Sequence, residues 1–220
     1  MAKKLLQKIK NFPKKKRRIF IGAIALSVLL LAAGTVFLFA FPAYYIKMFG
    51  VKLQPSQDFA VRNVPYYLQN DPDWSGDKIG DSNHGFGGSG CLICCAAATM
   101  TDLDVPVTPP ELNAALTNAG GFDGADLIWY KINEVYAEID YSYARVFGSA
   151  DIENLLREGF LPIVNVKYRG IGRTHWVVII GAADGEFIIY DSLQTNCEPI
   201  KLSVHGRVYA YRVLVPVGRR

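Results

Sequence analysis

Residues 90–103 read GCLICCAAATMTDL and carry no charge before Asp102. Small and apolar side chains along the whole stretch are typical of a helix inside a core, where alanine and cysteine permit close packing. A glycine-rich loop, residues 85–90, precedes it. We therefore expect a buried helix that begins at Cys91, directly after a flexible turn of the chain.

The start of a helix is a favourable place for a reactive thiol. The thiolate is the nucleophilic form of cysteine, and a helix N-terminus and a nearby imidazole both stabilise it. The backbone N–H groups at a helix start also point toward a developing oxyanion. Position alone leaves Cys91 equally open to an inert, buried role, so its partners decide between the two interpretations.

Candidate partners lie in the β-rich second half of the chain. His175 stands in a β-type run, and Asp191 follows one hairpin later, after a turn at residues 182–185. A carboxylate on the far side of an imidazole holds the ring in place and stabilises its cation. We expect the hairpin to bring Asp191 beside His175. His84 and His205 each adjoin a glycine in a loop, so we rank them lower.

A fourth candidate, Gln69, lies upstream of the cysteine in the stretch 66–71. A side-chain amide there can donate a hydrogen bond to an oxyanion, alongside the Cys91 N–H, which is a contact worth a few kcal/mol in the transition state. The alternative is a polar loop residue with no part in chemistry.

The other cysteines give no cofactor site. Cys94 and Cys95 fall one turn into the helix and should pack inward as core residues. The spacing of Cys91 and Cys94 also occurs in redox motifs, but no thioredoxin-like frame is evident. A zinc site needs a second close pair of ligands, and Cys197 and His205 are poorly spaced for that role. The sequence implies no metal and no organic cofactor.

The N-terminus carries a different signal. Residues 1–18 contain nine Lys or Arg and no acid, and residues 19–41 are uncharged and apolar. That length suits a helix that crosses a bilayer, with the basic tail 1–18 in the cytoplasm and the remainder extracellular. A cleaved signal peptide is the alternative, but the apolar run is long and no clean cleavage site follows it.

The net charge of +4 is therefore due to the basic N-terminal tail. Without the nine basic residues of the tail, 15 Lys and Arg face 20 Asp and Glu, a net charge of −5. This balance gives no indication of nucleic-acid binding. We expect a linker over residues 42–60 and one domain over residues 61–220.

Helix-type patterns come first in this domain and strand-type patterns second, which predicts an α+β fold with an antiparallel sheet. Thr108 is the expected N-cap of the second helix, which a glycine pair ends. The predicted helices are residues 91–103, 109–119, 127–139 and 151–158. The predicted strands are residues 161–168, 176–181, 186–191, 200–204 and 208–215.

The domain contains a series of short segments whose order and spacing match those of a known family. They are residues 64–74, 78–80, 89–91 with 97–100, 174–178 and 190–191. Together they resemble the C39-like group of papain-fold cysteine peptidases, over about residues 61–215. The chain departs from that pattern at Ser192, where the family often has proline, and no nucleotide-binding motif accompanies the domain.

This resemblance implies a papain-like fold and a peptide or protein substrate. It also implies roles: Cys91 is the nucleophile, His175 the general base and then acid, Asp191 the orienting residue, and Gln69 the oxyanion donor. Two alternatives stay open, namely a catalytically inactive surface module that binds peptide or wall material, and a cell-wall amidase or acyltransferase with the same residues.

Overall fold

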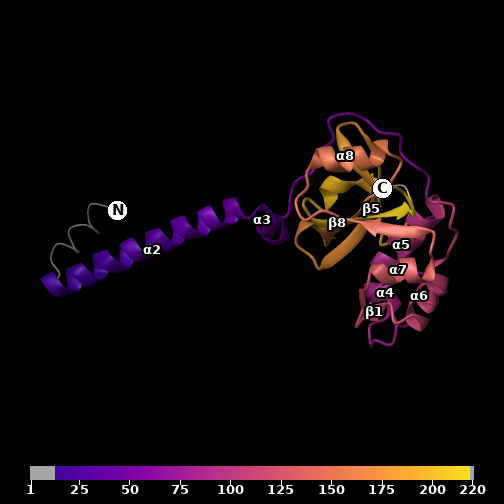
Figure 1. Ribbon diagram of the computed structural model, residues 1–220, viewed down its shortest axis with the longest axis horizontal. Helices are drawn as coiled ribbons and strands as arrows, with labels where there is room; N and C mark the ends of the chain where they lie inside the picture. Colours follow the sequence, from indigo (N-terminus) through magenta and orange to yellow (C-terminus); the bar gives the residue numbers. More distant parts are fainter. Residues whose placement is uncertain (1–12, 219–220) are drawn as a thin grey trace. The chain divides into compact units, whose positions relative to one another are not determined.

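The computed structural model describes residues 13–218. The chain divides into two units, one that ends at Tyr45 and one that begins at Ile46. Most of the first unit is α2 (Lys14–Ala40), drawn in indigo in Figure 1. This helix is exposed over residues 14–37, and it is long and apolar enough to cross a membrane. Of the predicted basic tail, residues 1–12 lie outside the described part of the chain.

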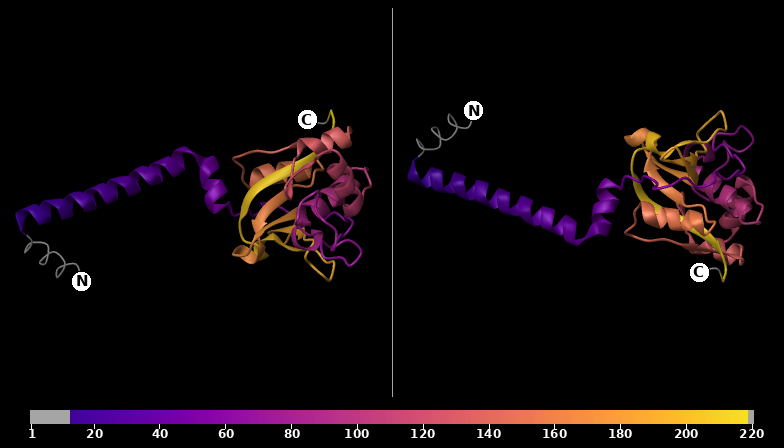
Figure 2. Two further views of the ribbon diagram at one scale, coloured as in Figure 1. Left: turned by 90° about the horizontal axis from the view of Figure 1, so that it is seen from below. Right: turned by 90° about the horizontal axis from the view of Figure 1, so that it is seen from above.

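The second unit combines helices with a six-stranded antiparallel sheet, as the α+β prediction required. The strand order is β3-β8-β4-β5-β6-β7, and the orange and yellow strands lie together in both views of Figure 2. The strands are β3 (Ile139–Ser142), β4 (Ile163–Lys167), β5 (Thr174–Ala183), β6 (Glu186–Tyr190), β7 (Ile200–Lys201) and β8 (Val208–Pro216).

The helices flank this sheet. They are α4 (Phe86–Ser89), α5 (Cys91–Asp102), α6 (Pro109–Asn118), α7 (Tyr130–Val135) and α8 (Ser149–Arg157). Two single turns of 3₁₀ helix, η1 (Tyr168–Gly170) and η2 (Leu202–Val204), and a small hairpin of β1 (Phe122–Asp123) and β2 (Asp126–Leu127) complete the unit. α6 begins where predicted: the Thr108 and Glu111 side chains form a capping box at its first turn.

The sheet separates two apolar clusters. Along β5, Val178 and Ile180 face the cluster that contains α5, whereas Val177 and Ile179 face the cluster that contains Ile152 of α8. Figure 1 shows α5 and α8 on opposite sides of the strands. β5 is central in the sheet, as its continuous apolar run predicts.

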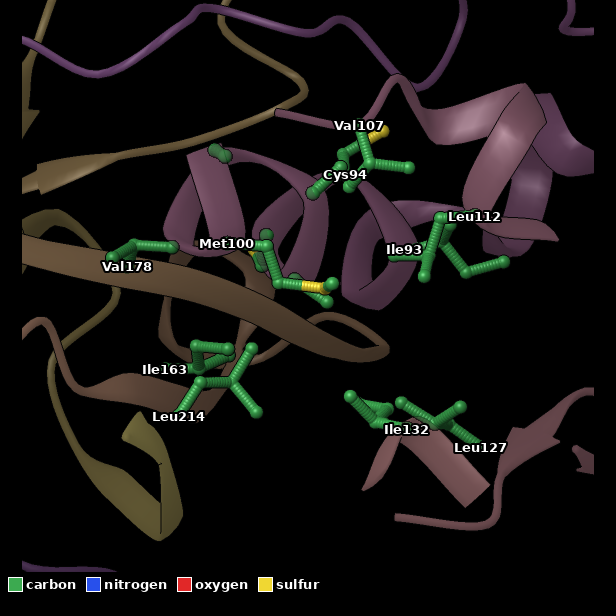
Figure 3. Packing of buried hydrophobic residues seen from close by; sticks show 14 of the residues in the cluster. Ile93, Cys94, Met100, Val107, Leu112, Leu127, Ile132, Ile163, Val178 and Leu214 are labelled. Carbon is green, nitrogen blue, oxygen red and sulfur yellow. The ribbon is translucent and has the colours of Figure 1, made fainter. Parts of the chain in front are cut away.

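Helix α5 is the centre of the first cluster. In Figure 3, Cys94 and Met100 of α5 lie between Val178 of the sheet and Leu112 of α6. Its residues from Cys94 to Ala98 are fully buried, so the helix has no room for larger side chains on any face. The buried helix expected at residues 91–103 is confirmed, and its position against the sheet is what brings Cys91 to β5.

One predicted helix is wrong in its extent. Residues 127–139 form not one helix but the end of β2, the short α7 and the start of β3. The reason is a distant pairing, because residues 139–142 add to the sheet as an edge strand against β8. The predicted strand 200–204 is likewise shortened to β7, since the chain turns through η2 directly afterwards.

The segment expected as a linker also contains structure. It begins with α3 (Pro42–Phe49), and Ser56 donates two hydrogen bonds to Glu153 of α8, at 2.7 and 2.8 Å. Isolated bridges join Val51 to β8 and Phe59 to β5. Residues 51–59 are therefore fastened along the second unit, where the purple segment in Figure 1 runs beside the domain.

Candidate active site

Cys91 is the first residue of α5, and Gly90 is its N-cap. The thiol side chain is mostly buried, with 8% of the residue exposed. Gly90 is required here, because a Cβ atom at this position would lie 2.3 Å from the Phe86 ring. Phe86 is fully buried under the turn and leads the chain into the helix start. Cys91 stands at the end of α5 where the first backbone N–H groups of a helix have no partner within it.

Cys94 and Cys95 differ from Cys91 in their surroundings. Both are fully buried, and burial raises the pKa of each thiol well above its usual value. The Cys95 thiol donates to the Trp176 carbonyl at 3.3 Å. The prediction that both are core residues is confirmed. The Cys95 contact also joins the second turn of α5 to β5, at the residue after His175.

His175 and Asp191 are joined by a hydrogen bond of 2.6 Å between the Nε2 atom and the Oδ1 atom. His175 is the second residue of β5, and Asp191 follows β6 directly. The connecting turn has Asp184 and Gly185 at φ angles of 54° and 71°, as a tight two-residue hairpin requires. The hairpin thus brings the two side chains together, as its spacing predicted.

The charges of this pair follow from its contacts. Burial lowers the pKa of His175, but hydrogen bonds to Asp191 and Cys91 outweigh this and raise it from 6.5 to about 9. Burial raises the pKa of Asp191, but the bonds from His175 and His205 outweigh this and hold it well below its usual range. Since Nε2 of His175 faces Asp191, Nδ1 is the nitrogen available to Cys91. At neutral pH the pair is an imidazolium and a carboxylate.

These shifts predict a pH-dependent stability. The raised pKa of His175 stabilises the fold fully below the pKa of an unfolded histidine, about 6.5, and this contribution is lost as pH rises through about 9. The lowered pKa of Asp191 has the opposite sign and matters only in acid. We expect the free energy of unfolding to fall by about 2–3 kcal/mol between about pH 6.5 and 10. Urea titrations of the full chain in detergent measure it.

The matched control for this prediction is His175→Gln, which removes the titrating ring. Other groups also titrate above about pH 9, so the informative quantity is the difference between the two proteins. If the wild-type protein and His175→Gln lose stability in parallel over this range, the imidazolium is not stabilised by the fold.

Gln69 is buried, with 3% exposed, and lies against both halves of the site. Its Nε2 atom donates to the Gly87 carbonyl at 2.8 Å, in the loop that leads to Cys91. Its Oε1 atom accepts from the Ser192 hydroxyl at 3.3 Å, and its backbone N–H donates to the Ser192 carbonyl at 3.0 Å. These contacts orient the amide and leave one Nε2 hydrogen for a further acceptor.

Ser192, noted above as a departure from the family pattern, therefore has a structural role. It is fully buried and directly follows Asp191. A proline in its place could neither donate a side-chain hydrogen bond nor fix which end of the Gln69 amide faces Gly87.

His205 is the residue that the sequence did not assign to the site. It is 1% exposed, and its Nε2 atom lies 3.1 Å from Oδ2 of Asp191. The Asp191 carboxylate therefore bonds one imidazole through each oxygen and also accepts the Leu193 N–H at 2.9 Å. His84, the other histidine ranked lower, is exposed. No local pattern separates the two, because both adjoin glycine in turns.

Two histidines and a carboxylate also raise the question of a metal. In the described part of the chain, the possible ligand atoms of His175, Asp191 and His205 lie within 4.8 Å of one another. However, Nδ1 of His205 accepts the Arg169 N–H at 3.0 Å, so Nε2 carries the ring proton. A protonated nitrogen has no lone pair for a metal ion. The donor set fits a chain of hydrogen bonds and not a metal centre.

Comparison with solved structures finds a likeness of fold. No protein-family model matches the chain, and no curated protein matches it. The chain is similar in structure to a proposed C39-like peptidase from Bacillus anthracis. The likeness covers 73% of this chain and 98% of that one, at 11% sequence identity and a TM-score of 0.49. At this level of likeness, function must be argued from the side chains themselves.

Proposed function

We propose that the chain is a membrane-anchored cysteine peptidase that hydrolyses peptide bonds outside the cytoplasm. The observation that carries the proposal is the 2.6 Å hydrogen bond from His175 to Asp191, on an imidazole that also bonds Cys91 at the start of α5. A nucleophile, a base and an orienting group in this order are what thiol acyl transfer requires.

The reaction runs in two steps. The Cys91 thiolate attacks the amide carbonyl and forms a tetrahedral oxyanion, and the His175 imidazolium gives its Nδ1 proton to the leaving amine as the C–N bond breaks. Neutral His175 then takes a proton from water, which attacks the thioester and releases the acid and the thiolate. Asp191 holds the ring and stabilises its charged form throughout.

The oxyanion is held by Gln69 and the Cys91 N–H in this proposal. The free Nε2 hydrogen of Gln69 supports the assignment, as do the contacts to Gly87 and Ser192, which fix the amide in advance. Donors that are already oriented need no rearrangement when charge develops.

A substitution at this position has a defined consequence. We expect Gln69→Ala to lower kcat by about 10²–10³-fold, since one oriented donor to the oxyanion is lost. KM should change little, because the ground-state carbonyl makes a weaker contact. Steady-state kinetics on one peptide measure the changes in kcat and KM separately. Asn133→Ala, which also removes a side-chain amide that bonds the backbone, is a control away from the site. A Gln69→Ala protein with wild-type kcat would remove Gln69 from the mechanism.

The anchor is α2. Its exposed apolar surface and its length support a single membrane crossing, and residues 14–18 at its start are all basic. By the positive-inside rule this end is cytoplasmic, so the domain that contains Cys91 is extracellular.

One experiment tests the reaction and separates hydrolysis from acyl transfer to an amine and from binding alone. The full chain in detergent is incubated with a peptide library and a simple primary amine, and the products are read by mass spectrometry. New carboxyl ends that incorporate oxygen from labelled water indicate a peptidase or an amidase, and new amide ends indicate a transferase. No product, together with a Cys91 that iodoacetamide does not alkylate near neutral pH, would leave only a binding module.

A further inference from the structure

The second imidazole on Asp191 has a distinct protonation state. Nδ1 of His205 accepts the backbone N–H of Arg169 at 3.0 Å, so it carries no hydrogen. Its Nε2 atom must then be the N–H that donates to Oδ2 of Asp191 at 3.1 Å. His205 is thus a neutral ring in one tautomer, and it links a backbone amide to the carboxylate.

The loop between β4 and β5 is shaped to make this link. Arg169 has a φ angle of 50°, a left-handed conformation that non-glycine residues seldom adopt. Such strain persists where the surroundings hold the residue in place. The neighbouring Tyr168 ring packs on both imidazoles, with ring centroids 5.7 Å from His175 and 5.6 Å from His205. The two histidine rings are 5.8 Å apart.

We propose that His205 is a positioning residue, which as a neutral Nε2–H donor holds the Asp191 carboxylate in line with His175. With one oxygen bonded to each imidazole and the Leu193 N–H on Oδ1, the carboxylate cannot rotate without breaking a contact. His205 touches no reacting atom and acts only through Asp191. The expected effect of His205 on kcat/KM rests on the proposed function. The tautomer of the His205 ring does not.

The pKa of His175 is a measurable readout of how His205 holds Asp191, because the bond from Asp191 raises it. The ionisable side chains that face the two imidazoles are Asp191, Cys91 and Tyr168, and Arg169 lies over the Tyr168 ring. If Asp191 turns away, the imidazolium loses its main stabilising bond, and the pKa of His175 falls toward its usual value.

The test begins with the unaltered protein. The full chain is labelled with ¹⁵N-histidine in detergent, and ring nitrogen shifts report the tautomer of each of its three histidines. We expect His205 to be a neutral Nε2–H ring near neutral pH. A neutral Nδ1–H ring, or a doubly protonated one, would overturn the proposal without any variant.

Variants then measure the consequence. His205→Leu removes the donor at similar volume, whereas His205→Gln keeps an N–H near the Nε2 position, and His84→Leu is the exposed control. In His205→Leu we expect the pKa of His175 to fall by about one unit. We also expect kcat/KM, expressed per active site, to fall about tenfold or more. In His205→Gln and His84→Leu both values should stay near wild type.

The outcomes separate this proposal from the peptidase proposal. A His205→Leu protein with unchanged His175 titration and unchanged kcat/KM overturns the positioning role, and so does a His205→Gln protein as impaired as His205→Leu. If the peptidase proposal fails, the wild-type protein shows no hydrolysis that depends on Cys91, while the tautomer of His205 and the response of His175 are still as expected.

Discussion

Replacing Cys91 with alanine should abolish hydrolysis. We expect kcat/KM to fall by at least about 10⁴-fold, because the variant has no atom that can form the thioester, and the remaining oxyanion donors act only on a poorly nucleophilic water. The iodoacetamide adduct at residue 91 should disappear with it, whereas the adduct at the exposed Cys197 should remain. Both are measured on the full chain, by peptide cleavage and by mass spectrometry of the alkylated protein.

The other cysteines supply controls for this experiment. Cys197 is exposed, so Cys197→Ala removes an accessible thiol without touching the site. It should retain wild-type hydrolysis and lose only the adduct at residue 197. Cys94 and Cys95 should not label, since burial raises the pKa of each thiol. Substantial activity in Cys91→Ala would end the proposal of a thiol nucleophile, whatever else the fold resembles.

Local patterns in the sequence were sufficient where the interactions are local. The small, uncharged residues after Cys91 predict α5, and the turn at Asp184 and Gly185 predicts the hairpin that brings Asp191 to His175. Both depend on neighbours in the chain: a helix that tolerates only small side chains, and two positions with positive φ. The central place of β5 follows in the same way from its continuous apolar run.

The failures occurred where distant segments decide the structure. Ile139 continues the helical spacing of the apolar residues before it, but pairing with β8 makes it the start of an edge strand. His205 gives no signal beside a glycine, because its burial depends on Arg169 and Asp191, which come from other loops. The structural role of Ser192 is visible only in its hydrogen bond to Gln69, which joins residues more than half the chain apart.

These failures share a consequence for the proposed mechanism. The groups that do the chemistry are recognisable by type and order, whereas the groups that hold them are identified only by their contacts. His205 and Ser192 are both fully or nearly fully buried polar residues that bond a proposed catalytic side chain. Burying a polar group is costly unless it is hydrogen-bonded, so such residues support the site's geometry as much as its stability.

Replacing His175 with alanine should be nearly as severe as losing the thiol. We expect kcat/KM to fall by about 10³–10⁴-fold, because the leaving amine has no proton donor and the thiolate loses its imidazolium partner. The rate of Cys91 alkylation near neutral pH should fall as well, because the neighbouring imidazole is gone. Peptide cleavage and alkylation rates at this pH measure the two effects separately.

The fold should tolerate this change well enough for the comparison. Asp191 keeps two donors in His175→Ala, the His205 ring and the Leu193 N–H, so no buried carboxylate is left without a partner. His84→Ala removes an exposed ring and is the matched control, expected to keep wild-type cleavage and alkylation. An alkylation rate of His175→Ala equal to that of the wild-type protein would mean that the imidazole does not act on Cys91. Because the sulfur is intact in this variant, that result would count against the pairing of thiol and imidazole, and not against the thiol itself.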